Sequence, residues 1–446
     1  MTLLDSLPSL HRAAAMRLDP AIWPVTTQVD VDGRMCVGGV SLSELADQYG
    51  TPAYVIDEAD FRYRARRYRT LLRGTRIVYA AKALLTTELA RWVSDEGLGL
   101  DVCSAGELAV AVAAGLDPRR IVVHGNAKST RELQAAAAAD VGRIVIDGAT
   151  ELALLASQLR TPRQVLIRVT PDVDIHAHPA VTTGVTDQKF GFAIAGGDAL
   201  LAARRVLDQP MLRLVGLHFQ LGSQVTDPEA YGESIRRTIA LMADVRSRHG
   251  VVLTELNIGG GHAVPYVVGD DELDLDELAG VIDDALDDAC AAERFPRPSI
   301  VVEPGRALSA RAGVTCYRVA SIKRQPGGRT FVVVDGGMGD NPRVALYGAR
   351  YTVAVANRHP LGPTQPVTVA GRYCEAGDVI ARDVALPTDL HPGDLLAVAC
   401  TGAYHHSMAS PYNMVGRPPL VAVRDGRTRL LVRRETTEDL LSRDLG

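Results

Sequence analysis

Residues 76–81 read Arg-Ile-Val-Tyr-Ala-Ala, and similar short apolar runs follow at residues 98–102 (Leu-Gly-Leu-Asp-Val) and 120–124 (Arg-Ile-Val-Val-His). Runs that are apolar along most of their length are typical of parallel strands buried on both faces. Ala-, Leu- and Glu-rich stretches with helical patterning, such as residues 107–114, lie between them. This part of the chain therefore predicts a repeated strand–helix unit.

Five further runs of the same kind continue the pattern along the chain. They are residues 143–147, 164–169, 214–218, 253–258 and 299–303. Eight strand–helix units over about 230 residues match the (β/α)8 TIM barrel, which typically takes about 250. A doubly wound open sheet is the alternative, but it would rarely contain eight units built so evenly. We therefore expect an α/β barrel over residues 49–309.

The residue pattern of the sequence changes after residue 310. Helical patterns give way to short Val-, Thr- and Leu-rich runs separated by Gly, Pro and Asp, which are typical of an antiparallel sheet. These runs are residues 330–335, 366–370, 395–399, 420–423 and 429–432. A small β element is also predicted near residues 28–31. We expect a C-terminal antiparallel β domain over residues 310–446 that also takes in the N-terminal segment 1–48, with the barrel inserted between them.

The composition excludes several classes of protein. The 446 residues are 47% apolar, which is enough for a substantial core and excludes a disordered chain. The 48 Lys and Arg residues against 53 Asp and Glu residues give a net charge of −5 without a basic patch, so we expect no nucleic-acid partner. No apolar run approaches the roughly 18 residues of a membrane span, and no secretory signal is evident. Six widely spaced cysteines indicate free thiols, so we expect a cytoplasmic protein that does not bind a membrane.

Polar residues stand where all eight predicted strands end. In a barrel of this type the active site lies at the carboxyl ends of the strands. The exposure of strand ends to water accounts for part of this pattern, but not for a lone lysine after Tyr-Ala-Ala or for a triple glycine. The strand-end residues are Lys82, Asp101, His124, Asp147, Arg168, His218, the run Gly259-Gly260-Gly261 and Glu303.

Lys82 and the triple glycine suggest an aldehyde that carries a phosphate. A lysine among apolar side chains at the mouth of a barrel can lose its proton and form an imine, although a surface lysine is the commoner explanation for Lys82 alone. Backbone N–H groups of residues without a Cβ can close around a phosphate, although a triple glycine can also form a plain tight turn. Ser223, which follows Gly222, offers a further phosphate donor.

Glu303 and Arg306 complete the pattern. A carboxylate beside a pyridine nitrogen keeps that nitrogen protonated, so the ring withdraws electrons strongly. Arg306 can pair with a phosphate or a carboxylate through two nitrogens. An isolated Glu-x-x-Arg is more often a structural ion pair. A lysine, a phosphate cradle and a partner for a pyridine nitrogen together indicate a pyridoxal 5'-phosphate site.

Several stretches of the sequence resemble the signature blocks of the diaminopimelate decarboxylases. These enzymes belong to the alanine-racemase-like, fold type III pyridoxal phosphate enzymes, together with ornithine and arginine decarboxylases. The resemblance runs from about residue 20 to the C-terminus. The blocks are Tyr79-Ala-Ala-Lys82, His218-Phe-Gln-Leu-Gly-Ser-Gln224, Gly259-Gly-Gly261, Glu303-Pro-Gly-Arg306, Asp335-Gly-Gly-Met-Gly-Asp-Asn341, Cys374-Glu-Ala-Gly-Asp378, Gly402-Ala-Tyr404 and Tyr412-Asn-Met-Val-Gly-Arg417.

The resemblance implies a role for each matching residue. Lys82 would hold the cofactor, Glu303 would face its ring nitrogen, and Cys374 would deliver a proton to the carbanion left by CO2. The implied cofactor-binding residues are Lys82, Asp101, Arg168, Gln220, Ser223, Gly259, Gly260, Gly261, Glu303, Gly305, Arg306 and Tyr404. The implied substrate-binding residues are Arg306, Arg343, Tyr347, Glu375 and Tyr404. Because Cys374 and Glu375 come from the partner subunit in the family, the resemblance also implies a homodimer with shared active sites.

The chain departs from the family pattern at positions expected to face the cofactor. The family has His-x-His before Leu-Gly-Ser, and its second histidine stacks on the cofactor ring, whereas Gln220 stands at that position here. An amide can cover a ring but cannot become cationic. We expect His218 to point to the other side of the strand and so not to replace that histidine. After Gly261 the chain has His262-Ala263 in place of an apolar residue and glycine.

The residues together predict a carboxy-lyase, a pyridoxal phosphate-dependent amino-acid decarboxylase that converts meso-2,6-diaminopimelate into L-lysine and CO2 in lysine biosynthesis. A decarboxylase of the same fold that acts on another or a carrier-tethered amino acid is the first alternative, prompted by Gln220 and His262. An amino-acid racemase is less favoured, since Cys374 lies in a Cys-Glu block. An inactive cofactor-binding homologue is less favoured because Lys82 and Glu303 are both present.

Histidine pairs do not indicate a metal site in this sequence. His176 with His178 and His405 with His406 lack a third ligand at helix spacing, so we expect loop histidines and no metal.

Overall fold

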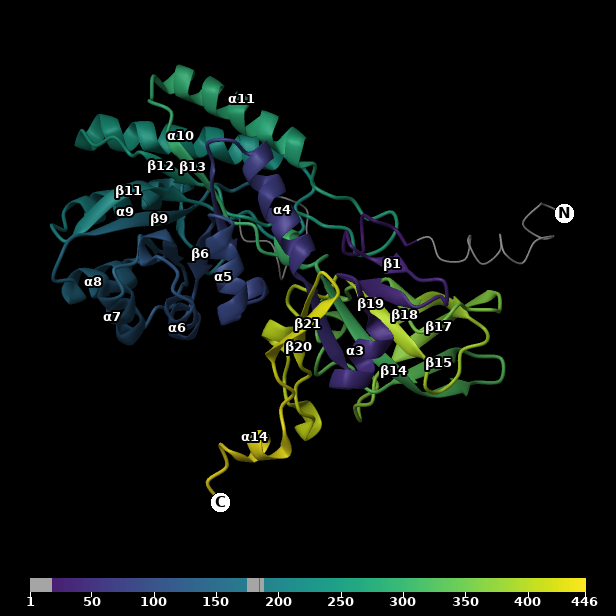
Figure 1. Cartoon of the computed structure of the whole chain (residues 1–446). Coiled ribbons are helices and arrows are strands. Elements are labelled where there is room, and N and C mark those ends of the chain that lie inside the picture. Colours follow the sequence, from purple (N-terminus) through teal and green to yellow (C-terminus); the bar gives the residue numbers. More distant parts are fainter. Residues whose placement is uncertain (1–17, 175–183, 185–187) are drawn as a thin grey trace. The chain divides into compact units, whose positions relative to one another are not determined.

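The computed structural model describes residues 18–174, 184 and 188–446 (Figure 1). His176 and His178 lie outside the described residues. The chain divides into two compact units, each of which is described by itself. The first unit comprises residues 1–63, 265–270 and 309–446, and the second comprises residues 64–264 and 271–308.

Eight parallel strands form a closed barrel in the second unit. Each strand pairs with the next along the chain, and the last strand pairs with the first, so the sheet has no open edge. The predicted TIM-like barrel is thereby confirmed. The strands are β5 (Arg76–Ala80), β6 (Gly99–Val102), β7 (Ile121–Val123), β8 (Arg143–Ile146), β9 (Arg163–Thr170), β11 (Leu212–His218), β12 (Glu255–Asn257) and β13 (Ser299–Val302).

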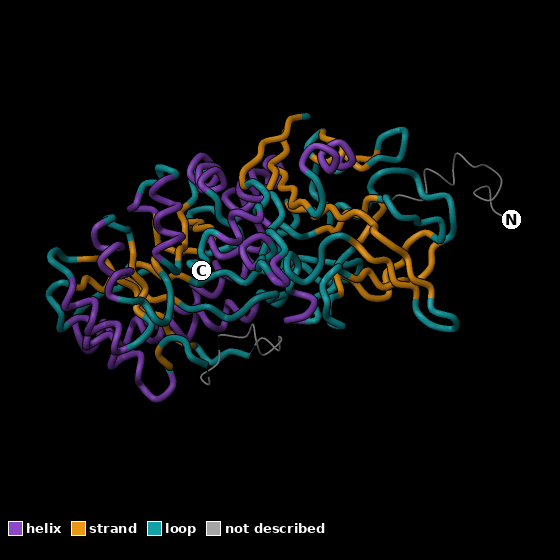
Figure 2. Tube along the Cα trace, turned by 90° about the horizontal axis from the view of Figure 1, so that it is seen from below, coloured by secondary structure: helices purple, strands orange, loops and turns teal. Residues whose placement is uncertain are grey.

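Helices alternate with these strands along the chain and lie on the outside of the sheet (Figures 1 and 2). Polar residues directly before several helices satisfy the first free N–H groups, as the side chains of Thr86, Ser104, Ser129 and Asp274 do. The helices are α4 (Glu58–Leu71), α5 (Thr87–Asp95), α6 (Ala105–Ala113), α7 (Thr130–Ala138), α8 (Ala149–Gln158), α9 (Asp198–Leu207), α10 (Glu229–His249) and α11 (Leu275–Glu293). Short elements between them are η1 (Ala81–Ala83), η2 (Pro118–Arg120), β10 (Phe192–Ala193) and η4 (Ala195–Gly197).

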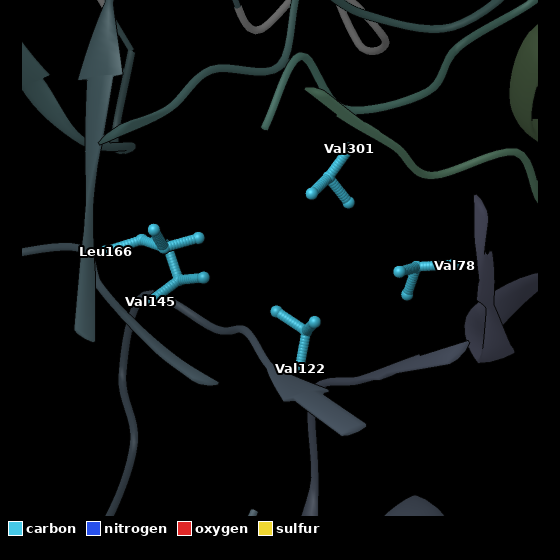
Figure 3. Packing of buried hydrophobic residues seen from close by; sticks show 5 residues of the cluster. All are labelled: Val78, Val122, Val145, Leu166 and Val301. Carbon is cyan, nitrogen blue, oxygen red and sulfur yellow. The ribbon is translucent and has the colours of Figure 1, made fainter. Parts of the chain in front are cut away.

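The interior of the barrel is filled by branched aliphatic side chains. Five of them, from five different strands, point toward one another (Figure 3) and are at most 2% exposed. Burying each contributes about 1.5–3 kcal/mol relative to an exposed side chain. They are Val78, Val122, Val145, Leu166 and Val301. The interior of the barrel is therefore closely packed below the strand ends, and this core supports the polar residues at those ends.

The first unit is a mixed β domain that includes the N-terminal segment, as predicted. Strand β4 (Ala53–Asp57) starts beyond residue 48 and pairs antiparallel with β14 (Gly313–Arg324) and parallel with β20 (Leu420–Arg424). The other strands of its large sheet are β15 (Thr330–Val334), β16 (Val353–Val355), β17 (Thr364–Ala370), β18 (Val379–Pro387), β19 (Leu395–Ala399) and β21 (Arg427–Val432). A small antiparallel sheet contains β1 (Gln28–Val29), β2 (Met35–Val37) and β3 (Val40–Ser41).

This sheet is not purely antiparallel, because β15 pairs with β17 and β4 with β20 in parallel. Parallel neighbours need a long crossover connection, and both pairs have one. The helical elements of this unit are α3 (Leu42–Tyr49), α12 (Arg306–Ser309, which begins in the barrel unit), α13 (Arg343–Tyr347), η5 (His406–Met408), η6 (Tyr412–Met414) and α14 (Thr437–Leu441). Across the described ranges, none of the helices combines the length and apolarity that a membrane span requires.

Candidate active site

The carboxylate of Glu303, directly after β13, lies at the centre of a buried polar cluster. Its Oε1 atom accepts a hydrogen bond from Asn257 Nδ2 (2.7 Å) and lies 2.8 Å from His124 Nε2. Its Oε2 atom lies 3.4 Å from His218 Nε2. These side chains come from the ends of three different strands, and all are at most 8% exposed. The expectation that His218 points to the other side of its strand is wrong, because its ring lies inside the barrel and meets His124 edge-on with ring centroids 4.7 Å apart.

The charges in this cluster depend on burial and on each other. Burial alone would raise the pKa of Glu303, but His124 and His218 outweigh it and hold that pKa well below the usual range. Burial disfavours the cationic form of His124, yet Glu303 and Asp101 outweigh it and raise the pKa of His124. Burial lowers the pKa of His218 to about 3 and raises that of Asp101 to about 6. The cluster thus favours a carboxylate at Glu303 and a neutral imidazole at His218, and it shifts His124 toward its cationic form.

Lys82 lies next to Glu303's segment at the same end of the barrel. It is the exposed middle residue of η1, which directly follows β5, and buried alanines flank it. Ala80 N donates a hydrogen bond to Pro304 O (3.2 Å), so the ends of β5 and β13 lie side by side. A Cβ at Gly305 would lie 3.0 Å from Ala80 Cβ, and this glycine therefore permits the close approach. The prediction that the lysine and the glutamate share one end of the scaffold is consistent with these contacts.

The triple glycine forms a loop in which backbone segments approach closely. Gly259 and Gly261 have φ values of 68° and 98°, which favour glycine. A Cβ at Gly260 would collide with the carbonyl oxygen of Glu303, and one at Gly261 with that of Gly222. A cradle whose space any side chain would fill is the feature expected of a loop that closes backbone N–H groups around a phosphate. Gly259 N and Gly260 N donate to Asn257 Oδ1 (2.9 Å) and Gln220 Oε1 (2.8 Å) in this structure, and binding of the cofactor's phosphate by the loop stays a prediction.

Gln220 braces this loop from the side. Its Oε1 accepts a hydrogen bond from Gly260 N (2.8 Å), and its Nε2 donates one to Gly222 O (2.6 Å). Arg306 Nη2 donates to Ser223 Oγ (2.8 Å) in the same region. Gln220, Ser223, Arg306 and the glycines are thus brought together as expected, and the amide of Gln220 ties two backbone segments.

His262, the other departure from the family pattern, is buried behind the glycine loop. Its Nδ1 lies 2.7 Å from the hydroxyl oxygen of Tyr68, and the two rings are stacked with centroids 5.6 Å apart. Tyr231 meets His262 edge-on and donates a hydrogen bond to Gly260 O (2.8 Å). Burial lowers the pKa of His262 to about 4, so the ring is neutral and packs as an aromatic filler.

Arg168 contacts Asp147 and Phe190, which the sequence did not suggest as its partners. Its Nη1 lies 3.6 Å from Asp147 Oδ1, and its guanidinium lies 4.3 Å from the ring centroid of Phe190. Beside it, Lys128 Nζ donates to Glu151 Oε1 (2.7 Å). A role for Arg168 in cofactor binding stays a prediction.

The remaining predicted residues lie in the β domain. Arg343, at the start of α13, is buried, donates to Tyr351 Oη (2.6 Å), and has its guanidinium 5.0 Å from the ring centroid of Tyr266 and 6.0 Å from that of Tyr404. Burial would lower the pKa of Arg343, but Tyr266 and Tyr351 outweigh burial and raise that pKa. Tyr347, at the end of the same helix, is 37% exposed. The structure therefore groups Arg343 with Tyr404 and leaves Tyr347 facing outward in this unit.

Cys374 and Glu375 lie in an exposed turn between β17 and β18. Cys374 N donates to Asn413 Oδ1 (3.3 Å), and Tyr412 Oη donates to Glu375 Oε2 (2.7 Å). Asp378 closes the base of the turn, since it accepts hydrogen bonds from the backbone of Tyr373 and Met338. The two signature blocks at 374–378 and 412–417 thus form one local assembly that presents Cys374 and Glu375 to the outside of their unit.

Sequence reasoning named His124 as a strand-end residue without giving it a role, and it missed Asn257. Both stand at strand ends, and Asn257 interrupts the apolar run before Ile258, which is the signal that could have identified it.

His405 and His406 have aromatic contacts, with Tyr351 and Tyr54 respectively.

A TIM barrel with a lysine after its first strand, a triple-glycine loop and a buried carboxylate after its last strand is the arrangement of the alanine-racemase-like class of pyridoxal phosphate enzymes. The family model described as "pyridoxal-dependent decarboxylase, pyridoxal binding domain" matches residues 58–310. The chain is 53% identical over 445 residues to the diaminopimelate decarboxylase of Actinosynnema pretiosum subsp. auranticum, covering 100% of both chains. It is 45% identical over 439 residues to that of Mycobacterium tuberculosis, covering 96% of this chain and 98% of the relative.

Solved structures agree with the sequence comparisons. The crystal structure of diaminopimelate decarboxylase from M. jannaschii in complex with L-lysine has a TM-score of 0.88 and 31% identity, covering 95% of this chain and 98% of that one. The chain therefore belongs to the diaminopimelate decarboxylase family of pyridoxal-dependent decarboxylases. Its cofactor is pyridoxal 5'-phosphate.

Replacing Gly260 with alanine should weaken cofactor binding, because the added Cβ meets the Glu303 carbonyl and forces the cradle open. We expect the dissociation constant of pyridoxal phosphate, measured by absorption titration, to rise about tenfold or more. Gly280→Ala is the matched control, since Gly280 lies in α11 with nothing within 4 Å of an added Cβ. It should leave cofactor affinity unchanged and stabilise the helix by about 0.5–1 kcal/mol. Equal affinity in the Gly260→Ala and Gly280→Ala variants would contradict the cradle.

His262 should make the fold acid-sensitive. Because its pKa is about 4 in the folded chain against 6.5 when exposed, the unfolded chain alone takes up a proton between these values, and stability falls as the pH drops through that window. His262→Leu should be less stable at pH 8, since the Tyr68 hydroxyl loses its partner, but the gap in Tm to wild type should close toward pH 4. The pH-dependent part amounts to about 3 kcal/mol. His391→Leu, at an exposed histidine, is the control, and a gap for His262→Leu that stays constant from pH 8 to pH 4 would refute the prediction.

Proposed function

We propose that this chain removes CO2 from meso-2,6-diaminopimelate and releases L-lysine. The observation that carries the proposal is the placement of Lys82, the glycine cradle and Glu303 on adjoining strand ends of a barrel whose chain is 53% identical to a diaminopimelate decarboxylase over its whole length. Lysine biosynthesis is the corresponding pathway.

The residues of the barrel would hold the cofactor. When bound, pyridoxal phosphate supplies a ring that accepts the electron pair left on the α-carbon as the bond to CO2 breaks. The Lys82 amine would bind the aldehyde carbon, and the Gly259–Gly261 loop with Ser223 would receive the phosphate. Glu303, which its neighbours keep ionised, would hold a proton on the ring nitrogen.

The residues of the β domain would recognise the substrate and return the proton. Diaminopimelate carries an ammonium and a carboxylate at each end, so its distal end needs groups of both charges. Arg343 and Arg306 suit carboxylates, and Glu375 suits the distal ammonium. The Cys374 thiol would protonate the α-carbon after CO2 has left. Tyr347 and Tyr404 would line the substrate site.

The test combines a visible spectrum with a substrate panel. Purified protein loaded with pyridoxal phosphate should show a visible absorption band that is lost in Lys82→Ala, because the covalent link to the amine is gone. CO2 release should occur with meso-diaminopimelate and be at least about a hundredfold slower with ornithine and arginine, since a missing charged group leaves buried partners unpaired. Release from another amino acid but not from diaminopimelate would refute the proposal in favour of the same-fold alternative. A racemised product without CO2 would identify a racemase.

We also propose a homodimer with shared active sites, working in the cytoplasm. Cys374 and Glu375 are exposed in their own unit, which suits residues that serve the site of a second chain. All six cysteines are free thiols, which suits a reducing compartment.

Co-expression of two inactive variants with different tags tests the shared site. Lys82→Ala and Cys374→Ala should each be inactive alone, whereas their random mixture should recover about a quarter of wild-type activity, because half the dimers are mixed and each has one intact site. Activity no higher than the sum of the two variants would show that each chain completes its own site.

A further inference from the structure

The contacts of Glu303 are distributed unequally over its two carboxylate oxygens. Oε1 is held by both Asn257 Nδ2 at 2.7 Å and His124 Nε2 at 2.8 Å, whereas Oε2 has the longer approach of His218 Nε2 at 3.4 Å among the described residues. A carboxylate that is fixed through one oxygen presents the other in a set direction. Here Oε2 faces the ring of His218, and Glu303 is 5% exposed.

We propose that His124 and Asn257 are positioning residues that orient Glu303, so that Oε2 is the atom presented to the ring nitrogen of the cofactor. This inference rests on the cofactor role of Glu303 in the proposed function, but not on the identity of the substrate. Neither His124 nor Asn257 needs to touch the reacting atoms for the effect.

The two positioning residues reach Glu303 from different parts of the barrel. Asn257 ends β12, the neighbour of β13, whereas His124 follows β7, three strands further round in the other direction. Contacts from two sides restrict both rotation and tilt of the carboxylate. A single contact would leave one of these motions free.

Asn257 also connects the carboxylate to the phosphate cradle. Its Nδ2 donates to Glu303 Oε1, while its Oδ1 accepts a hydrogen bond from Gly259 N (2.9 Å). The amide of Asn257 is buried, with 0% exposure. It therefore fixes the distance between Glu303, which would face the ring nitrogen, and the glycine loop, which would receive the phosphate.

His124 adds charge to its positional effect. The groups that face it are Glu303 from β13, Asp101 from β6 at 4.0 Å, His218 from β11, and Lys82 from η1, which acts through its charge. The two carboxylates outweigh burial and the charge of Lys82, so they raise the pKa of His124 and favour its cationic form. A cation against Oε1 makes Glu303 a weaker base, so a proton shared between Oε2 and the ring nitrogen stays on the nitrogen. Without His124 the proton moves toward Glu303, and the ring withdraws electrons less strongly.

The test uses holoenzyme loaded with pyridoxal phosphate labelled with 15N in the ring, observed by solid-state NMR. Wild type should give the signal of a protonated ring nitrogen, and His124→Phe should move it toward that of neutral pyridine. His124→Gln, which keeps a donor without the charge, should lie between them. Asn257→Ala should weaken cofactor binding about tenfold, as expected for a lost hydrogen bond to a charged group.

Kinetics and a matched control separate positioning from stability. In His124→Phe, kcat should fall about tenfold or more with KM nearly unchanged, because the ring and not substrate binding is affected. Thr238→Val removes a buried hydroxyl of α10 that donates to Ser234 O (2.7 Å), and it should lower Tm while leaving the 15N signal and kcat as in wild type.

Identical 15N signals in wild type and His124→Phe would overturn the inference. If His124→Phe does not fold, the comparison of His124→Gln with Thr238→Val decides it, and identical signals there overturn it as well. A protein that shows the expected 15N shift but releases no CO2 from diaminopimelate would refute the proposed substrate and leave this inference standing.

Discussion

The pairing of β13 with β5 is the constraint on which the rest of the site depends. It aligns Val301 with Arg76 and Val302 with Ile77, and so joins the two ends of a barrel that are more than two hundred residues apart in sequence. Lys82 and Glu303 each follow one of these strands, and the bond from Ala80 N to Pro304 O holds their segments together. If the register slipped by one residue, the alternation of side chains would turn one of these segments away from the other.

At the carboxyl ends of the barrel strands, neighbouring groups keep the buried carboxylate of Glu303 ionised. Burial of Glu303 would by itself favour a protonated carboxyl, and the neighbouring histidines reverse that tendency. The arrangement is asymmetric, since His124 is favoured as a cation while His218, almost as close, is held neutral. The opposite pKa shifts of the two histidines arise from the position of each ring relative to Asp101 and Glu303. The identity of the residue alone does not predict them.

The sequence was sufficient for the features that are local or periodic. The apolar runs predicted all eight barrel strands, and the strand ends predicted Lys82, Glu303 and the glycine loop. Features that depend on which side chains meet across the barrel were not predictable in the same way. His218 was placed on the wrong side, and its strand contains a register shift between Leu214 and Gly216 that the sequence does not signal. The bracing role of Gln220 depends on the separate approach of Gly222 and Gly260. The parallel pairing of β4 with β20 depends on a connection hundreds of residues long, for which the chain has no local signal.

The amide of Asn257 has a thermodynamic consequence for partial ligands. Because one side chain is bonded both to Glu303 and to the backbone of Gly259, ordering either end of the site lowers the entropy cost of ordering the other. Binding of inorganic phosphate should then raise the affinity for a pyridine that lacks the phosphate, and the reverse should also hold. The intact cofactor, which bridges both ends, gains more than the sum of its fragments.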